Sequence, residues 1–235
     1  MKTTVSIVIP VHNEEAIIEH ALTRLVAEFR PLARDFEILP VENGSRDRTW
    51  EIMQTLSAKE PSIRPLRSPR ADYGFALKHG IRESRGEFIL SDEIDVLDHG
   101  FHAAALQALA TADLIIASKR HPDAVDDRGL FRTLGTDVIT GMLRIACGLK
   151  SSDTHGPKGW RASVARDLVA RSRLDGDLFA SESVIRAERM GLNLRELPLS
   201  ISEHRATSIP LMKRVPRVIR DIWKLRKALA EDTTG

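Results

Sequence analysis

The sequence predicts an α/β fold in which helices flank a mostly parallel sheet. Short apolar runs alternate along the chain with stretches that repeat apolar residues at helical spacing, a pattern typical of βαβ units. Three of the apolar runs end in polar segments, at residues 8–15, 40–45 and 90–95. Because ligands bind outside the carboxyl ends of strands in an open α/β sheet, these segments together indicate one nucleotide site.

A strand over residues 5–11 and the helix after it form the first predicted unit. The strand is short, continuously apolar and rich in β-branched residues, as expected in a parallel sheet covered on both faces. Asn13 is expected to cap the helix, and Glu14 and Glu15 suit the positive end of its dipole. The buried face of this helix is predicted to carry Ala16, Ile17, Leu22 and Leu25.

The later segments repeat this unit. Further strands are predicted over residues 36–41, 63–67, 87–90, 113–118 and 193–201, and helices over 47–56 and 73–82. The polar stretch 121–129 has the composition of a mobile loop, and we interpret it as one that orders over a substrate.

Composition limits the domain organisation and the partners. With 42% hydrophobic residues in a chain of 235, we expect one main domain over residues 1–210 and a basic amphipathic C-terminal helix and tail over 211–235. The formal net charge is +2, which argues against a general polyanion binder. Residues 211–227 carry seven basic residues against one acidic residue, so the positive charge is concentrated in this segment.

Cysteine content and hydropathy indicate the compartment. Cys147 is the single cysteine, so no intrachain disulfide can form, and its apolar surroundings favour a packing role. No apolar run reaches the about 18 residues that a membrane span needs. We therefore expect a cytoplasmic protein that is soluble or peripheral on the inner face of a membrane.

Carboxylates gather after the strand predicted to end near residue 90. Glu93 and Asp95, with Asp92 and Asp98 beside them, lie within seven residues. Oxygen ligands at a strand end suit Mg²⁺ or Mn²⁺ bound to a diphosphate, where the metal neutralises charge on a leaving nucleoside diphosphate. The alternative is a solvated acidic turn that caps the next helix, and the two polar strand ends upstream make it the less favoured interpretation.

A family resemblance rests on segments that occur in a fixed order. These are VSIVIPVHNEE, VENGSRDRT, DYGFALKHGI, GEFILSDEID, DTHGPKGWRA and MGLNLRELPL, and the resemblance covers residues 4 to about 210. In this order they resemble the inverting family 2 glycosyltransferases of GT-A (Rossmann-like) fold, most of all the dolichyl- or polyprenyl-phosphate sugar transferases. The resemblance implies a UDP- or GDP-linked sugar donor, Mg²⁺ or Mn²⁺ as cofactor, and a polyprenyl phosphate as the leading acceptor.

The resemblance also assigns a donor site. The nucleotide-sugar would contact Pro10, Val11, His12, Glu14, Glu42, Gly74, Lys78, Asp92 and Arg205, and the metal would bind Glu93 and Asp95. Within this set, Glu42 would hold the base or ribose, while Gly74 and Lys78 would close around the diphosphate. The family usually has aspartates where this chain has Glu42, Asn43 and Glu93, which leaves open a degenerate protein that binds nucleotide without turnover.

The two possible acceptor classes, a hydroxyl and a lipid phosphate, need different side chains from the part of the site that binds the acceptor. Asp153 matches the family position that faces the acceptor, and a small hydroxyl acceptor would need it as a general base. A lipid phosphate is already anionic and needs cations to position it. The cations available for this are Lys119, Arg120, Arg128, Arg132 and Lys158, of which Arg132 best matches the family's lipid-phosphate arginine.

The C-terminal segment has the pattern of a basic amphipathic helix. Its predicted apolar face carries Leu211, Val215, Val218, Ile219, Ile222, Trp223 and Leu229. Such a helix with a tryptophan is typical of binding to an anionic membrane surface, and a terminal helix packed on its own domain is the open alternative. Nucleic-acid binding is not indicated, because no aromatic residues interleave the basic ones as stacking platforms.

Overall fold

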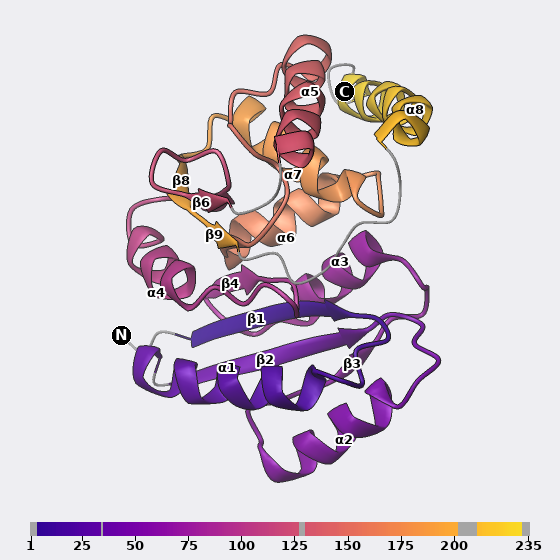
Figure 1. The fold of residues 1–235 in the computed structure, drawn as a ribbon. Coiled ribbons are helices and arrows are strands. Elements are labelled where there is room, and N and C mark those ends of the chain that lie inside the picture. The colour runs from indigo at the N-terminus through magenta and orange to yellow at the C-terminus, as the bar shows by residue number, and fades with distance from the viewer. Residues whose placement is uncertain (1–3, 34, 127–129, 202–210, 232–235) are drawn as a thin grey trace.

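A seven-stranded sheet with helices on both faces forms the centre of the structure (Figure 1). The computed structural model describes residues 4–33, 35–126, 130–201 and 211–231, without the side chains of 125–126, 130–137, 200–201 and 211–217. The strands of the sheet are β1 (Thr4–Val11), β2 (Asp35–Glu42), β3 (Leu66–Arg67), β4 (Phe88–Ser91), β5 (Leu114–Ser118), β7 (Lys158–Arg161) and β8 (Leu194–Pro198). Their spatial order is β3-β2-β1-β4-β7-β5-β8. The predicted α/β class with a mostly parallel sheet is therefore confirmed.

The helices divide between the two faces of the sheet. One face is covered by α1 (Ile18–Leu32), α2 (Thr49–Lys59) and α4 (His99–Ala108), and the other by α3 (Tyr73–Glu83), α6 (Ala162–Arg171) and α7 (Leu178–Arg189). Alternate residues of β1 serve the two cores, since Ile7 and Ile9 pack toward α1 and Val8 packs toward α3. A central strand buried on both faces explains the continuous apolar run in the sequence.

Four adjacent strands place their carboxyl ends at one edge. β1 pairs in parallel with β2, where Val11 lies opposite Glu42, and with β4, where Val8 lies opposite Ser91. The short strand β3 pairs with the end of β2. The polar segments that follow β1, β2 and β4 therefore converge, as the sequence predicts.

β7 is antiparallel to both of its neighbours, and the sequence did not predict it. It pairs with β4 and β5, and Lys158 at its start lies opposite both Ser91 and Ile116. Because β7 runs against β4, its first residues lie where β4 ends. The chain from 153 to 158 thus reaches the same edge of the sheet as the polar ends of the parallel strands.

The predicted cap of the first helix is wrong. α1 begins at Ile18, its N-cap residue is Ile17 without a side-chain cap, and a turn closed by the Glu14 carbonyl precedes it. Asn13 has a φ of 55°, a left-handed conformation that asparagine tolerates better than most residues. Its side chain accepts a hydrogen bond from the Arg46 amide at 2.8 Å, and its own amide donates to Ser45 Oγ at 3.0 Å. Asn13 therefore ties the β1 turn to the β2 turn.

Two helices lie at the far end of the molecule from β2 (Figure 1). α5 (Leu130–Cys147) packs against α8 (Leu211–Ala230), and α8 also packs on α7. Cys147 is buried in this contact, as expected. The predicted loop at 121–129 contains a short strand, β6 (Val125–Asp126), which pairs in parallel with β9 (Ser200–Ile201). Among the described residues, no helix has both the length and the apolar character to cross a membrane.

Candidate functional site

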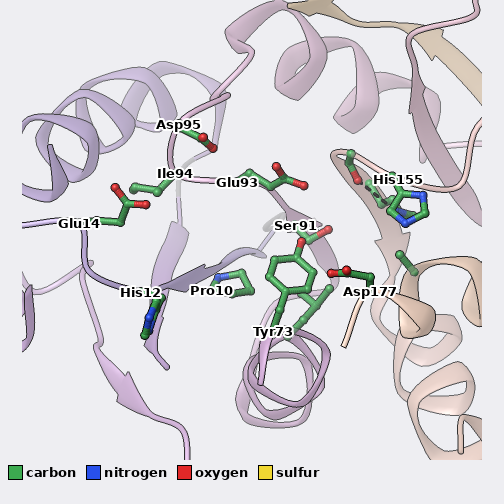
Figure 2. Close-up of a pocket in the computed structure, with 14 residues that line it drawn as sticks. Pro10, His12, Glu14, Tyr73, Ser91, Glu93, Ile94, Asp95, His155 and Asp177 are labelled. Carbon is green, nitrogen blue, oxygen red and sulfur yellow. Dashed lines mark hydrogen bonds between the residues drawn. The ribbon is translucent and has the colours of Figure 1, made fainter. Parts of the chain in front are cut away.

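A cavity of about 290 Å³ opens at the edge where the strand ends converge. Its walls come from the ends of β1 and β4, the first turns of α3 and α7, and the approach to β7. Figure 2 shows Glu14, Ile94 and Asp95 on one side of this cavity, and His155 and Asp177 on the other. Six residues assigned to the site from sequence line it, namely Pro10, His12, Glu14, Glu93, Asp95 and Lys158.

The turns after β1 and β2 are fixed to each other. His12 Nδ1 lies 2.8 Å from the Asn43 carbonyl oxygen, and the Glu14 amide donates to Thr49 Oγ1 at 2.8 Å. These contacts join segments more than thirty residues apart in the chain. The cavity wall formed by Pro10, His12 and Glu14 is therefore held by the loop of the neighbouring strand.

Two of the predicted donor residues are buried behind this wall. Val11 is 1% exposed and belongs to the core. Glu42 is also 1% exposed, and its carboxylate accepts hydrogen bonds from the Ser45 amide and, at 3.1 Å, from Arg67 Nε. In this arrangement Glu42 stabilises the turn after β2, and its assigned contact with the base or ribose stays a prediction.

Glu93 and Asp95 both face the cavity, with Ile94 between them partly in the core. Burial raises the pKa of Glu93, Lys119 lowers it, and the nearby Asp95 and Asp92 raise it again. Like charges crowded in a partly buried place favour a bound cation, because the cation stabilises the ionised forms. The carboxylate pair therefore fits a hard divalent ion such as Mg²⁺ or Mn²⁺.

Asp92 points away from these two carboxylates. It is 2% exposed, and its Oδ2 lies 2.6 Å from Nε2 of the buried His102. Its Oδ1 accepts a hydrogen bond of 2.7 Å from the Glu93 amide. Asp92 therefore positions the acidic turn and does not line the cavity in this structure.

Gly74 and Lys78, which were assigned to the diphosphate, contact the loop of residues 174–176 before α7. A Cβ atom at Gly74 would meet the backbone of Gly176, so only glycine allows this close approach. Lys78 is 3% exposed, and its Nζ donates to the Leu174 carbonyl at 2.5 Å and to Asp175 Oδ1 at 2.9 Å. Both residues hold the loop before α7 against α3, and their contact with a diphosphate stays a prediction.

The approach to β7 supplies the polar groups of the opposite wall. Burial lowers the pKa of Lys158 to about 8, although Asp153 and Glu93 act in the opposite direction. Burial and the charge of Lys158 also lower the pKa of His155, so this ring is neutral near pH 7. Asp153, the predicted base, is 2% exposed and lies behind this wall without lining the cavity, and its Oδ1 accepts a hydrogen bond of 2.9 Å from the His155 amide. Within the described part of the chain, no donor reaches its buried Oδ2.

The other predicted cations differ in how close they lie to the cavity and in whether the structure describes their side chains. Lys119 follows β5 and lies close enough to Glu93 and Lys158 to affect both pKa values, whereas Arg120 is exposed. Arg132 lies within α5, but its side chain is outside the described residues. Arg128 and Arg205 also fall outside them. The assigned roles of Arg132 and Arg205 therefore stay predictions.

Sequence reasoning missed several residues of the cavity wall. Tyr73 and His155 lie inside segments that carry the family resemblance, so their position next to Gly74 and Asp153 could have pointed to them. Asp177 precedes α7, far along the chain from the other groups, and no local pattern marks it. Burial, reinforced by four surrounding carboxylates that include Glu93 and Asp177, raises the pKa of Tyr73.

The sequence is similar to known glycosyltransferases. Residues 6–91, which run from β1 to the end of β4, match the model of glycosyl transferase family 2. Glycosyltransferase AglD of Haloferax volcanii is 26% identical over 94% of this chain and 37% of its own length. An undecaprenyl-phosphate 4-deoxy-4-formamido-L-arabinose transferase of Pseudomonas aeruginosa is 37% identical over 39% of this chain and 28% of its own length. The chain thus spans only about a third of the length of these curated relatives.

Solved structures share the whole fold. Glucosyl-3-phosphoglycerate synthase from Mycobacterium tuberculosis, crystallised with Mn²⁺, UDP-glucose and phosphoglyceric acid, superposes with a TM-score of 0.72 over 96% of this chain and 80% of its own. The sequences are 18% identical. The same enzyme bound to UDP alone gives a TM-score of 0.69. At this identity the likeness establishes the fold, which includes the second half that the family model does not reach.

Proposed function

We propose that this chain is a glycosyltransferase of family 2 on a GT-A fold, and that it moves a sugar from a nucleotide-sugar to a polyprenyl phosphate. The observation that carries this proposal is the pairing of charges across the cavity. Glu93 and Asp95 offer carboxylates on the donor side, and the buried Lys158 offers a cation on the other. A metal-bound diphosphate and an anionic acceptor would both find a charged partner there.

The donor site is the part that the parallel strands build. The related synthase binds Mn²⁺ with UDP-glucose, which supports a UDP-linked donor here, and a GDP-linked donor is the other class that the resemblance allows. A divalent ion at Glu93 and Asp95 would neutralise the charge that develops on the leaving diphosphate. Pro10, His12 and Glu14 would line the nucleoside, on a wall held rigid by the β2 turn.

Transfer would proceed by one direct displacement with inversion at the anomeric carbon. An oxygen of the acceptor phosphate forms a bond to this carbon while the bond to the β-phosphate oxygen breaks, and the electron pair leaves with the nucleoside diphosphate. A phosphate acceptor carries no proton that must be removed, so Lys158 and, by the family resemblance, Arg132 would serve to position it. A polyprenyl phosphate acceptor is supported by the similarity to the undecaprenyl-phosphate 4-deoxy-4-formamido-L-arabinose transferase.

A surface formed by α5 and α8 supports a membrane-bound acceptor. We call the exposed apolar side chains Val138, Ile145, Ile219 and Trp223 the α5/α8 patch; Ile145 is 91% and Trp223 66% exposed. The predicted apolar face of α8 is divided, because Ile222 and Leu229 pack inward while Ile219 and Trp223 remain outside. α8 also carries exposed cations, among them Arg220, Lys224 and Lys227. Apolar side chains next to cations suit the surface of an anionic bilayer, which would place the enzyme on the cytoplasmic face of a membrane.

A soluble hydroxyl acceptor is the second candidate. It is favoured by Asp153, whose buried Oδ2 accepts no hydrogen bond from the described residues and could accept the proton of a hydroxyl. The related synthase was crystallised with phosphoglyceric acid. In this case Asp153 would act as the general base, and Lys158 would stabilise its charged form.

The experiment is a transfer assay with labelled UDP-glucose or GDP-mannose, Mn²⁺, and undecaprenyl phosphate in detergent micelles. Label that moves into the organic phase supports the proposal. A parallel reaction with 3-phosphoglycerate in place of the lipid tests the second candidate. If neither acceptor is glycosylated although calorimetry detects donor binding, the chain would instead be a nucleotide-sugar binding protein, as the replacements at Glu42, Asn43 and Glu93 allow.

A further inference from the structure

A second cluster of metal-ligating side chains lies between α1 and α4, outside the cavity. Glu28 comes from α1, and His99 and His102 lie three residues apart on α4. His102 Nδ1 is 2.8 Å from Glu28 Oε1, and His99 Nδ1 contacts Glu28 Oε2. One potential ligand atom from each residue lies within 4.8 Å of the others.

We propose that Glu28, His99 and His102 bind a borderline-soft divalent cation, for which Zn²⁺ is the best match. Two imidazole nitrogens and one carboxylate oxygen form a ligand set that suits Zn²⁺, with water in the fourth position of a tetrahedron. This set differs from the all-oxygen pair of Glu93 and Asp95, which suits Mg²⁺ or Mn²⁺. The two sites would therefore select different metals.

The orientation of His102 agrees with this assignment. A ligating histidine usually donates its second ring N–H to a carboxylate, which fixes the ring and strengthens the ligand. His102 is 0% exposed, and its Nε2 lies 2.6 Å from Oδ2 of the buried Asp92. The Nδ1 atom, which faces Glu28, remains for the metal.

The local charge also favours a divalent cation. Glu28 and Asp92 bring two carboxylates to this place, and among the described residues the ion-pair partners of these carboxylates are the two histidines. A charge of 2+ balances both carboxylates while both imidazoles remain neutral ligands. His99 is the most exposed of the three ligands, with 33% of its side chain accessible, and provides the route by which an ion can enter.

The site would act on the acidic turn through Asp92. This residue joins His102 on one side to the Glu93 amide on the other. A metal at Glu28, His99 and His102 would therefore anchor the end of β4, from which Glu93 and Asp95 project. It is a structural ion in this proposal and takes no part in transfer.

The test uses chelator-stripped protein and two probes, Zn²⁺ and Co²⁺. We expect the wild type to retain one Zn²⁺ per chain after dialysis, and to show with Co²⁺ the intense visible absorption of a tetrahedral site. Asp95→Asn, which removes a ligand from the cavity, should retain both properties. His99→Ala and Glu28→Gln should each lower the Zn²⁺ affinity by at least about tenfold.

His20→Ala is the matched control, because His20 is an exposed histidine on α1 next to none of these groups. Circular dichroism establishes that each variant is folded, and the partial exposure of His99 makes its replacement the better tolerated one. Loss of Zn²⁺ in His99→Ala and Glu28→Gln but not in His20→Ala supports the site. Equal Zn²⁺ retention in all variants, or a wild type that binds no Zn²⁺, overturns it and leaves the cluster as an ion pair between His102 and its two carboxylates.

Discussion

The two walls of the cavity are built in different ways. The wall that we propose binds the donor, called the donor wall, follows the carboxyl ends of β1 and β4, two adjacent parallel strands, and its residues come at or directly after the ends of apolar runs in the sequence. The opposite wall, which we propose binds the acceptor and call the acceptor wall, is formed by the start of the antiparallel strand β7 and the first turn of α7. Its two parts are placed by the pairing of β7 with β4 and β5 and by contacts of the loop before α7 with α3 and with Asp72. The donor wall is therefore encoded locally, whereas the acceptor wall depends on tertiary packing.

Buried ion pairs and hydrogen bonds hold the acceptor wall in place. Glu182 is 0% exposed and accepts hydrogen bonds from the Arg173 and Leu174 amides and from the Arg186 guanidinium. The next residues of this loop, Asp175 and Gly176, bind Lys78 and Asp72 of the first half. This network holds Asp177 opposite the donor wall. Asp177 belongs to no strand, so the pairing of strands does not fix its position.

The largest effect is expected at the donor wall. Asp95→Asn should lower transfer by about 10³-fold, because a metal contributes several kcal/mol to the stabilisation of the leaving diphosphate. The same variant should lose the Mn²⁺-dependent part of UDP binding in calorimetry. Asp98→Asn is the control, since Asp98 caps α4 and asparagine caps a helix equally well. Unchanged Mn²⁺ dependence in Asp95→Asn would remove this residue from the metal site.

A smaller effect is expected at the acceptor wall. Lys158→Met keeps most of the side-chain volume but removes the charge, so transfer to a lipid phosphate should fall by about 10- to 100-fold while the UDP affinity stays the same. Lys59→Met, at an exposed position on α2, should change neither quantity. If Lys158→Met weakens UDP binding and acceptor use equally, the two walls do not divide the substrates as proposed. Asp153→Asn distinguishes the two acceptor classes. It should abolish transfer to a hydroxyl acceptor, which requires the base, and leave most of the transfer to a lipid phosphate.

The pH dependence sharpens this assignment. Lys158 has a pKa of about 8, below the usual lysine value because of its burial, so its charge is lost as the pH rises through about 8. The kcat/KM for a phosphate acceptor should therefore fall by about tenfold between pH 7 and 9. Lys158→Arg should flatten this decline, because a guanidinium remains charged throughout. A decline of the same size in Lys158→Arg would assign it to another group.

The smallest effect is expected at the α5/α8 patch. Ile145→Ser and Trp223→Ser should each reduce binding to vesicles of anionic lipid by about tenfold at low salt, since each removes apolar surface that a bilayer would bury. Leu32→Ser, at an exposed leucine of α1, is the matched control. Co-sedimentation with the vesicles measures the bound fraction. Wild-type protein that stays in the supernatant would indicate that α8 serves only to pack on α5 and α7.

The sequence predicted the first half of the fold well. The strand near residues 5–11 and the helix at 73–82 differ from the structure by one residue at most at either end. Their signals are local, namely continuous apolar runs and a helix start that Asp72 caps. Five of the assigned site residues, Pro10, His12, Glu14, Glu93 and Asp95, line the cavity because a strand end fixes where the next residues lie. Lys158, the sixth, reaches the cavity at the start of β7.

The rest could not be obtained from local patterns. β7 is four residues long and antiparallel, and its sequence, KGWR, has no strand periodicity. Asn13 was predicted as a helix cap because asparagine prefers that position, but its side chain is used by a hydrogen bond to the β2 turn, 33 residues away. The family resemblance assigned Asp92 to the donor, yet the buried His102, which only the folded chain brings close, turns it inward.

The position of Mn²⁺ in crystals grown with Mn²⁺ and UDP tests the central claim most directly, because its anomalous scattering locates the ion without reference to activity. The account predicts one peak at coordination distance, about 2.0–2.6 Å, from the carboxylates of Glu93 and Asp95, next to the diphosphate. A UDP molecule bound in the cavity with no peak at these two residues would contradict it.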